Sequence, residues 1–118
     1  MRQFIEPGSD VGASFDLFTN QAKKASRFLK ALSHETRLLI LCLLTEGEKT
    51  VGEIETILDL PQAVVSQQLA RLRQDNVVVT RRDGRLIFYS LADENVAAVM
   101  NTLYDVFCRP LMAREQGV

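Results

Sequence analysis

Two cysteines are the residues of this sequence best suited to do chemistry. Cys42 lies within the apolar run LLILCLL, and Cys108 lies near the C-terminus in VFCRP. With no third cysteine and a single histidine, His34, the chain has too few ligands for an ordinary four-ligand metal site. Two cysteines are the right number for a reversible thiol pair, although Cys42 alone is equally typical of a small buried apolar side chain. The residues by themselves leave both interpretations open.

The bulk composition predicts one cytoplasmic domain. Of the 118 residues, 47% are hydrophobic and 25% charged, which is ordinary for a globular protein with its own core. No stretch approaches the roughly 18 apolar residues that span a membrane, and the N-terminus lacks the apolar run of a signal peptide. Cytoplasmic thiols are normally kept reduced, so a disulfide there is more often regulatory than structural. We expect no membrane segment and no bound cofactor.

Charge is distributed unevenly along the chain, although the net charge of −1 argues weakly against nucleic-acid binding. Basic residues cluster at 23–30, 71–73 and 81–85, and acidic residues concentrate between 46 and 59. A protein with separate positive and negative faces can still bind phosphates with one of them.

The hydrophobic pattern first predicts four helices. Residues 1–14 have little apolar content and are expected to form a flexible N-terminal arm. Apolar residues at helical spacing predict a first helix over 15–32 and a second over 34–45, the latter capped by Ser33 and buried on all sides. A short third helix starts at Thr50, and Pro61 opens a fourth that runs to about residue 74.

From residue 76 onward the helical spacing of apolar residues gives way to β-branched and aromatic runs typical of strands. The runs NVVVTRR and RLIFYSL, joined at Asp83-Gly84, predict a β-hairpin. Asp93 is expected to cap a last helix that ends before Pro110, with 110–118 as a C-terminal tail. One domain over 15–109, in the order helix, helix, helix-turn-helix, hairpin, helix, is mainly α with a β-hairpin wing, which defines a winged helix-turn-helix.

The fourth helix and the hairpin carry candidate DNA-binding residues. Amide, hydroxyl and guanidinium groups on a helix read base edges in the major groove, and arginines at a wing contact the DNA backbone. The alternative is that these side chains simply solvate an exposed surface. The predicted DNA-binding residues are Gln62, Ala63, Ser66, Gln67 and Arg71 on the helix, and Arg81, Arg82 and Arg85 on the wing.

The first and last helices carry more apolar surface than one small domain can bury. A second copy is the natural cover, and a two-fold dimer presents two recognition helices to a palindromic site in double-stranded DNA. The alternative is a single well-packed monomer core. The predicted dimer-interface residues are Phe15, Phe18, Val96, Val99, Met100, Leu103 and Phe107.

The stretch LSHETRLLILCLL, followed by TVGEIETILDLPQAVVSQQLARLRQDNVVVTRRDGRLIFYSL, strongly resembles the ArsR family of small dimeric winged-helix repressors. The match covers residues 15–108 and is most specific in VSQQLARL and in DGRLIFYSL. The resemblance implies a homodimer formed by the first and last helices. It also implies that an inducer bound within the dimer weakens operator binding.

The usual residues for metal binding and catalysis are missing. Arsenic- and cadmium-type relatives carry a CxC in the helix before the recognition helix, where this chain has VGEIETIL. Zinc-type relatives carry four ligands along the last helix, of which Asp93 is present while Asn95, Val106 and Arg109 replace the others. His34 is expected to cap a helix or lie on the surface. The sequence shows no nucleophile–base pair, phosphate loop or paired acid motif, so we do not expect an enzyme.

The cysteines stand where the persulfide-sensing branch of the family, the SqrR/BigR type, carries its own. This resemblance implies that reactive sulfur species convert Cys42 and Cys108 to a di- or polysulfide bridge, which releases DNA and derepresses sulfide-detoxifying genes. Three alternatives stay open: a general oxidant sensor forming a plain disulfide, a metal-responsive repressor that uses groups of the partner subunit, and a winged-helix interaction module without DNA affinity.

Overall fold

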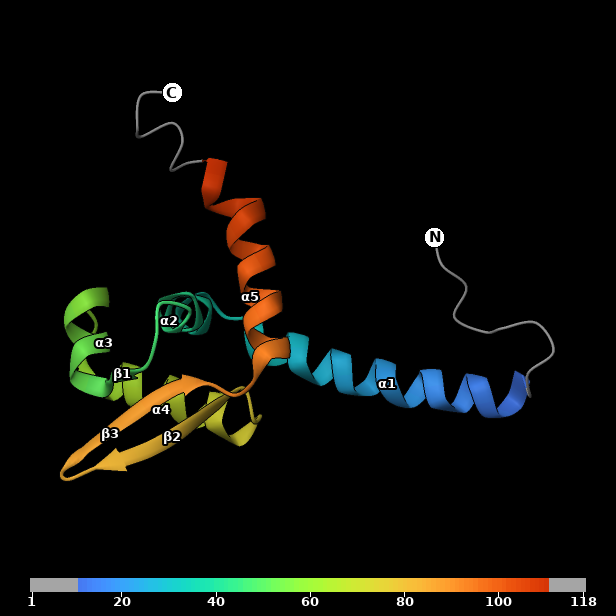
Figure 1. Cartoon of the computed structure of the whole chain (residues 1–118), viewed down its shortest axis with the longest axis horizontal. Coiled ribbons are helices and arrows are strands. Elements are labelled where there is room, and N and C mark those ends of the chain that lie inside the picture. The colour runs from blue at the N-terminus through green and yellow to red at the C-terminus, as the bar shows by residue number, and fades with distance from the viewer. Residues whose placement is uncertain (1–10, 111–118) are drawn as a thin grey trace.

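The structure is a computed structural model that describes residues 11–110. Over these residues it has five helices and a small sheet, so the prediction of a mainly α winged helix-turn-helix is confirmed. Figure 1 shows α2, α3 and α4 gathered beside the hairpin, while α1 and α5 extend away from this body. The elements are α1 (Val11–Leu32), α2 (Glu35–Leu44), β1 (Lys49–Thr50), α3 (Val51–Leu58), α4 (Gln62–Gln74), β2 (Val78–Asp83), β3 (Leu86–Leu91) and α5 (Glu94–Phe107).

The first helix is longer than the sequence pattern predicts. It begins at Val11 instead of Phe15. Residues 11–14 contain no proline, and the single Gly12 weakens a helix by only about 1 kcal/mol, which does not stop its growth. The rest of the expected N-terminal arm, 1–10, and the expected tail over 111–118 lie outside the described residues.

Side-chain caps fix where three helices start. Asp93 accepts a hydrogen bond from the Val96 amide at 2.9 Å, as predicted, and Thr50, predicted to start the third helix, is its N-cap and forms a capping box with Glu53. The cap of α2 was predicted one residue too early: His34, and not Ser33, has the extended backbone and accepts from the Thr36 amide.

The sheet contains a strand that the sequence pattern does not reveal. The strand order is β1-β3-β2, all antiparallel, with β1 pairing Lys49 to Tyr89 and Thr50 to Phe88. A two-residue strand is too short to show alternation, so no periodicity could have predicted it. The hairpin turn also lies one residue later than predicted, because the ladder continues to the Asp83–Leu86 pair and leaves residues 84–85 as the loop.

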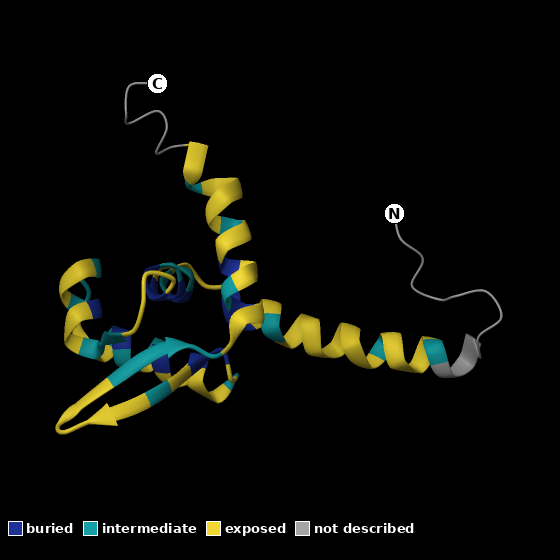
Figure 2. Cartoon of the chain, viewed as in Figure 1, coloured by how far each residue is buried: buried dark blue, intermediate teal, exposed yellow. Residues whose placement is uncertain are grey.

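The core lies where α2, α3, α4 and the first half of α5 meet, as the dark residues of Figure 2 show. Ile40, Ile54, Leu69 and Met100 are fully buried there. The prediction that α2 is buried on every side is wrong for Leu39, which is 46% exposed. No helix among residues 11–110 is long and apolar enough to cross a membrane.

Candidate DNA-binding surface and thiol site

Helix α4 buries one face and exposes the other. Its apolar residues Val65, Leu69 and Leu72 are fully buried in the core. It follows α3 across a short turn, as a second helix of a helix-turn-helix does. On the opposite face the predicted base-reading residues are exposed, except for Ser66, which is half-buried; they are Gln62, Ala63, Ser66, Gln67 and Arg71. This face carries few charged or bulky side chains and offers amide and hydroxyl groups, which suits entry into a major groove.

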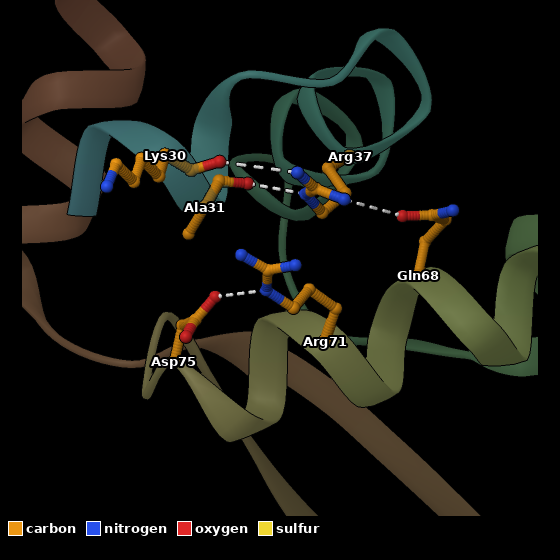
Figure 3. A network of polar contacts seen from close by, with 6 residues as sticks. All are labelled: Lys30, Ala31, Arg37, Gln68, Arg71 and Asp75. Carbon is orange, nitrogen blue, oxygen red and sulfur yellow. Dashed lines mark hydrogen bonds and ion pairs between the residues drawn. The ribbon is translucent and has the colours of Figure 1, made fainter. Parts of the chain in front are cut away.

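Arg71, which lies on that face, already forms an ion pair within the chain. The Arg71 side chain donates to the Asp75 carboxylate at 2.8 Å, one turn further along α4 (Figure 3). The pair holds the guanidinium toward the C-terminal end of the helix, where a cation is favoured by the helix dipole. Arg71 is therefore paired within the end of α4, and its contact with DNA stays a prediction.

The wing arginines do not behave alike. Arg81 donates twice to the Glu48 carboxylate, and its guanidinium lies 4.4 Å above the centre of the Phe88 ring. The hydrogen bond to Arg81 lowers the pKa of Glu48, and the same bond raises the pKa of Arg81. Arg82 and Arg85 are exposed and, within the described part of the chain, have no ion-pair partner.

The two cysteines border the same space between α2 and α5. Cys42 lies on α2, Cys108 forms the C-cap of α5, and both are half-buried free thiols. Both line two open grooves between these helices. One groove, of about 470 Å³, is apolar and includes Leu38, Met100 and Phe107 in its wall. The other, of about 610 Å³, is more polar and includes residues Thr45, Glu46, Asn101, Asp105 and Arg109.

The two thiols interact electrostatically. Burial raises the pKa of Cys42, and a thiolate at Cys108 raises it further. Cys42 therefore remains a neutral thiol at neutral pH. Because the folded state holds this proton more tightly than the unfolded state, the associated stability is present below the ordinary thiol pKa and is lost as the pH rises through the folded value.

Residues 11–110 contain no group of three or more histidine, cysteine, aspartate or glutamate side chains arranged to hold a metal ion. The two candidates singled out in the sequence have other roles. His34 accepts the Thr36 amide as a helix cap, and Asp93 accepts the Val96 amide at the start of α5.

Two of the predicted dimer-interface residues lie in the chain's own core. Val96 and Met100 are 6% and 0% exposed, so they have almost no surface left for a second copy. They belong to the face of α5 that packs on the domain, and an apolar pattern alone does not separate that face from an interface. Leu103 is half-buried against the same core. The remaining four residues are exposed: Phe15, Phe18, Val99 and Phe107.

Sequence reasoning missed the central polar contact of the domain. Arg37 on α2 is 8% exposed and donates to the Ala31 carbonyl at 2.6 Å, to the Lys30 carbonyl at 3.3 Å and to Gln68 Oε1 at 2.9 Å (Figure 3). Arginine is almost never fully buried, so nothing in the sequence predicts it here. The available signal was a lone cation directly before the apolar run of α2.

Comparisons with known proteins agree with this arrangement. The family model described as "Bacterial regulatory protein, arsR family" matches residues 34–80, which span α2 to the start of the wing. The biofilm growth-associated repressor of Agrobacterium fabrum (strain C58) is 43% identical over 107 residues, or 90% of this chain and 92% of the relative.

Two solved structures are similar in fold and in sequence. The transcriptional repressor BigR from Xylella fastidiosa has a TM-score of 0.72 and 41% identity, over 79% of this chain and 95% of its own. A homodimeric winged helix-turn-helix DNA-binding domain from Mycobacterium bovis has a TM-score of 0.72 and 29% identity, over 90% of this chain and 94% of its own. Together with the helix-turn-helix and wing described above, these matches show that the chain belongs to the arsR family of bacterial regulatory proteins.

Proposed function

We propose that this regulator is a homodimeric repressor that senses reactive sulfur species through Cys42 and Cys108. A di- or polysulfide bridge between them releases operator DNA and derepresses genes for sulfide detoxification. The observation that carries the proposal is that the two thiols, from α2 and α5, line the same two grooves.

The proposed bridge needs no oxidant beyond the inducer. A cysteine thiolate attacks the outer sulfur of an organic persulfide, which leaves a protein persulfide and releases the organic thiol. The second cysteine then attacks the inner sulfur of that protein persulfide, forms a disulfide and releases hydrogen sulfide. When both cysteines are first converted to persulfides, the same attack gives a trisulfide and hydrogen sulfide. In each case sulfane sulfur is reduced to hydrogen sulfide as the cysteines are oxidised.

The energy available from such a bridge is sufficient for a switch. Closing a loop of this length stabilises the conformation that accepts the bridge by at most about 4 kcal/mol in the chain-entropy picture. Allosteric coupling commonly needs about 1–3 kcal/mol. Because α2 also contacts α4, a change in how α2 sits against α5 acts close to the recognition helix.

Exposed apolar residues support the homodimer. Phe15 and Phe18 lie exposed on α1, which extends away from the body in Figure 1, and Phe107 at the end of α5 is 67% exposed. The similar domain from Mycobacterium bovis is homodimeric. A two-fold dimer built on these helices presents two copies of α4 to a palindromic operator.

The direct test is a DNA-binding titration of wild type, Cys42→Ser and Cys108→Ser, on a duplex selected by the reduced protein from a random library. Glutathione persulfide is expected to release DNA from wild type and to leave both serine variants bound, because neither can form the bridge. Mass spectrometry should show an intramolecular link in wild type alone.

Reduced protein in each case provides the control for folding and DNA affinity. Release of DNA from either serine variant by persulfide would contradict the dithiol switch. A link and release caused by peroxide and not by persulfide would assign the site to general oxidants, and tight stoichiometric zinc binding that releases DNA would assign it to a metal.

The proposed DNA surface predicts that removing the Glu48 charge, which pairs with the wing residue Arg81, increases the salt dependence of DNA binding. Glu48→Gln is expected to free Arg81 for phosphate, so that the slope of log affinity against log salt steepens by about 0.9. Fluorescence anisotropy of a labelled duplex across a salt series measures it. Glu46→Gln removes the same charge two residues away, beside Lys49, and serves as the matched control. Equal slopes for the two variants would show that Arg81 does not contact DNA.

A further inference from the structure

The guanidinium of Arg37 is the one buried charged side chain among residues 11–110. None of its three hydrogen-bond acceptors is a carboxylate: they are two main-chain carbonyls and one side-chain amide. The carbonyls of Lys30 and Ala31 belong to the last turn of α1, where they carry the negative end of the helix dipole; the Lys30 carbonyl also accepts from the Ser33 amide at 3.2 Å. The cation is therefore stabilised by α1 instead of by an ion pair.

The same side chain joins three helices. Arg37 is fixed on α2, two of its bonds are to the end of α1, and the third is to Gln68 on α4 (Figure 3). Gln68 is half-buried and faces Arg37, whereas the adjacent Gln67 is exposed on the base-reading face. The two neighbouring glutamines thus serve opposite sides of α4.

The bond to Gln68 is well placed to control the recognition helix. The apolar residues Val65, Leu69 and Leu72 determine which face of α4 packs on the core, but apolar contacts are not directional, so a polar contact adds precision to its orientation. The hydrogen bond from Arg37 is directional and attaches α4 to α1 and α2 at one point. Cys42 follows on the same short helix, so a bridge that displaces α2 also displaces the guanidinium that holds α4.

We propose that Arg37 and Gln68 are positioning residues that set the orientation of α4 for DNA and transmit the sulfur state of α2 to it. The inference rests on the proposed function for its second part only. Orientation of α4 by this bond affects DNA affinity whether or not the cysteines are a sensor.

Gln68→Met tests the inference, because methionine is close to glutamine in size but offers Arg37 no carbonyl acceptor. Arg37 keeps its two bonds to α1, so the domain is expected to fold. We expect about tenfold weaker binding of the selected duplex by the reduced protein. The ratio of DNA affinity between reduced and persulfide-treated protein is expected to fall toward unity, while mass spectrometry shows the bridge forming at the wild-type rate.

Two further variants separate this role from general damage to α4. Gln68→Glu keeps an acceptor for Arg37 and is expected to keep the wild-type affinity ratio. Gln74→Met makes the same chemical change at an exposed position of α4 and is expected to change neither quantity. Wild-type affinity and ratio in Gln68→Met would overturn the inference. If wild type itself keeps its DNA after persulfide treatment, the proposed function fails, while the affinity of reduced Gln68→Met still decides the positioning role.

Discussion

Replacing Arg37 by methionine is expected to lower the free energy of unfolding by about 3 kcal/mol, because it leaves the Ala31 carbonyl and the Gln68 amide without their donor. Methionine fills most of the same volume, so the loss reports the hydrogen bonds more than a cavity. Urea denaturation at a fixed protein concentration measures the loss, since unfolding of a dimer depends on concentration.

Arg73→Met is the matched control, because this arginine is exposed on α4 and has no ion pair within the described residues. Its expected effect is within about 0.5 kcal/mol of zero, as for most surface substitutions. A loss below about 1 kcal/mol in Arg37→Met, or an equal loss in both variants, would show that the buried contact contributes little to stability.

Replacing Gln62, Ser66 and Gln67 together by alanine is expected to lower affinity for the selected duplex by about 100-fold or more. Each good contact to a base edge contributes about 1–3 kcal/mol of discrimination, and none of these side chains carries charge. The salt slope is therefore expected to stay at its wild-type value. Anisotropy titrations at several salt concentrations measure both quantities. Denaturation should show nearly unchanged stability, since Gln62 and Gln67 are exposed and Ser66 is half-buried.

Substitutions on the wing are expected to change the salt slope and not the sequence preference, which is the opposite of the effect expected on α4. Arg82→Ala and Arg85→Ala are each expected to reduce the salt slope by about 0.9 and to weaken binding to unrelated duplexes as much as to the selected one. If the triple alanine variant bound the selected duplex as wild type does, α4 would not be the recognition helix. If it also lost salt dependence, its effect would be on phosphate contacts and not on base reading.

Local chemistry accounts for the parts of the fold that could be predicted. Thr50 and Asp93 cap helices because short oxygen-bearing side chains satisfy free amides at a helix start, which sequence alone reveals. The cap of α2 was missed because serine is the commoner cap, and the choice of His34 depends on how the chain leaves α1. Strand β1 depends on a partner nearly forty positions away and had no local signal.

The candidate site likewise has features that local spacing predicts and features that depend on contacts between distant residues. The apolar and polar faces of α4 follow from helical spacing, and the residues predicted for its polar face are exposed except for Ser66, which is half-buried. Spacing cannot say that Cys42 and Cys108 line the same grooves, and that expectation came from resemblance to the family. Nor does spacing separate Met100, which packs on the domain, from Phe107, which does not. Arg37 was missed because its acceptors lie on two other helices.

The segment that joins α2 to α3 belongs to both sites at once. Glu46 lines the polar groove beside the cysteines, while Glu48 holds Arg81 and the next two residues form β1 against the wing. Only Gly47, with φ of 137°, separates the two acidic residues. Surface loops usually tolerate insertions. An added residue here would shift β1 against β3 and part Glu48 from Arg81, so contacts at both of its ends constrain the length of this loop.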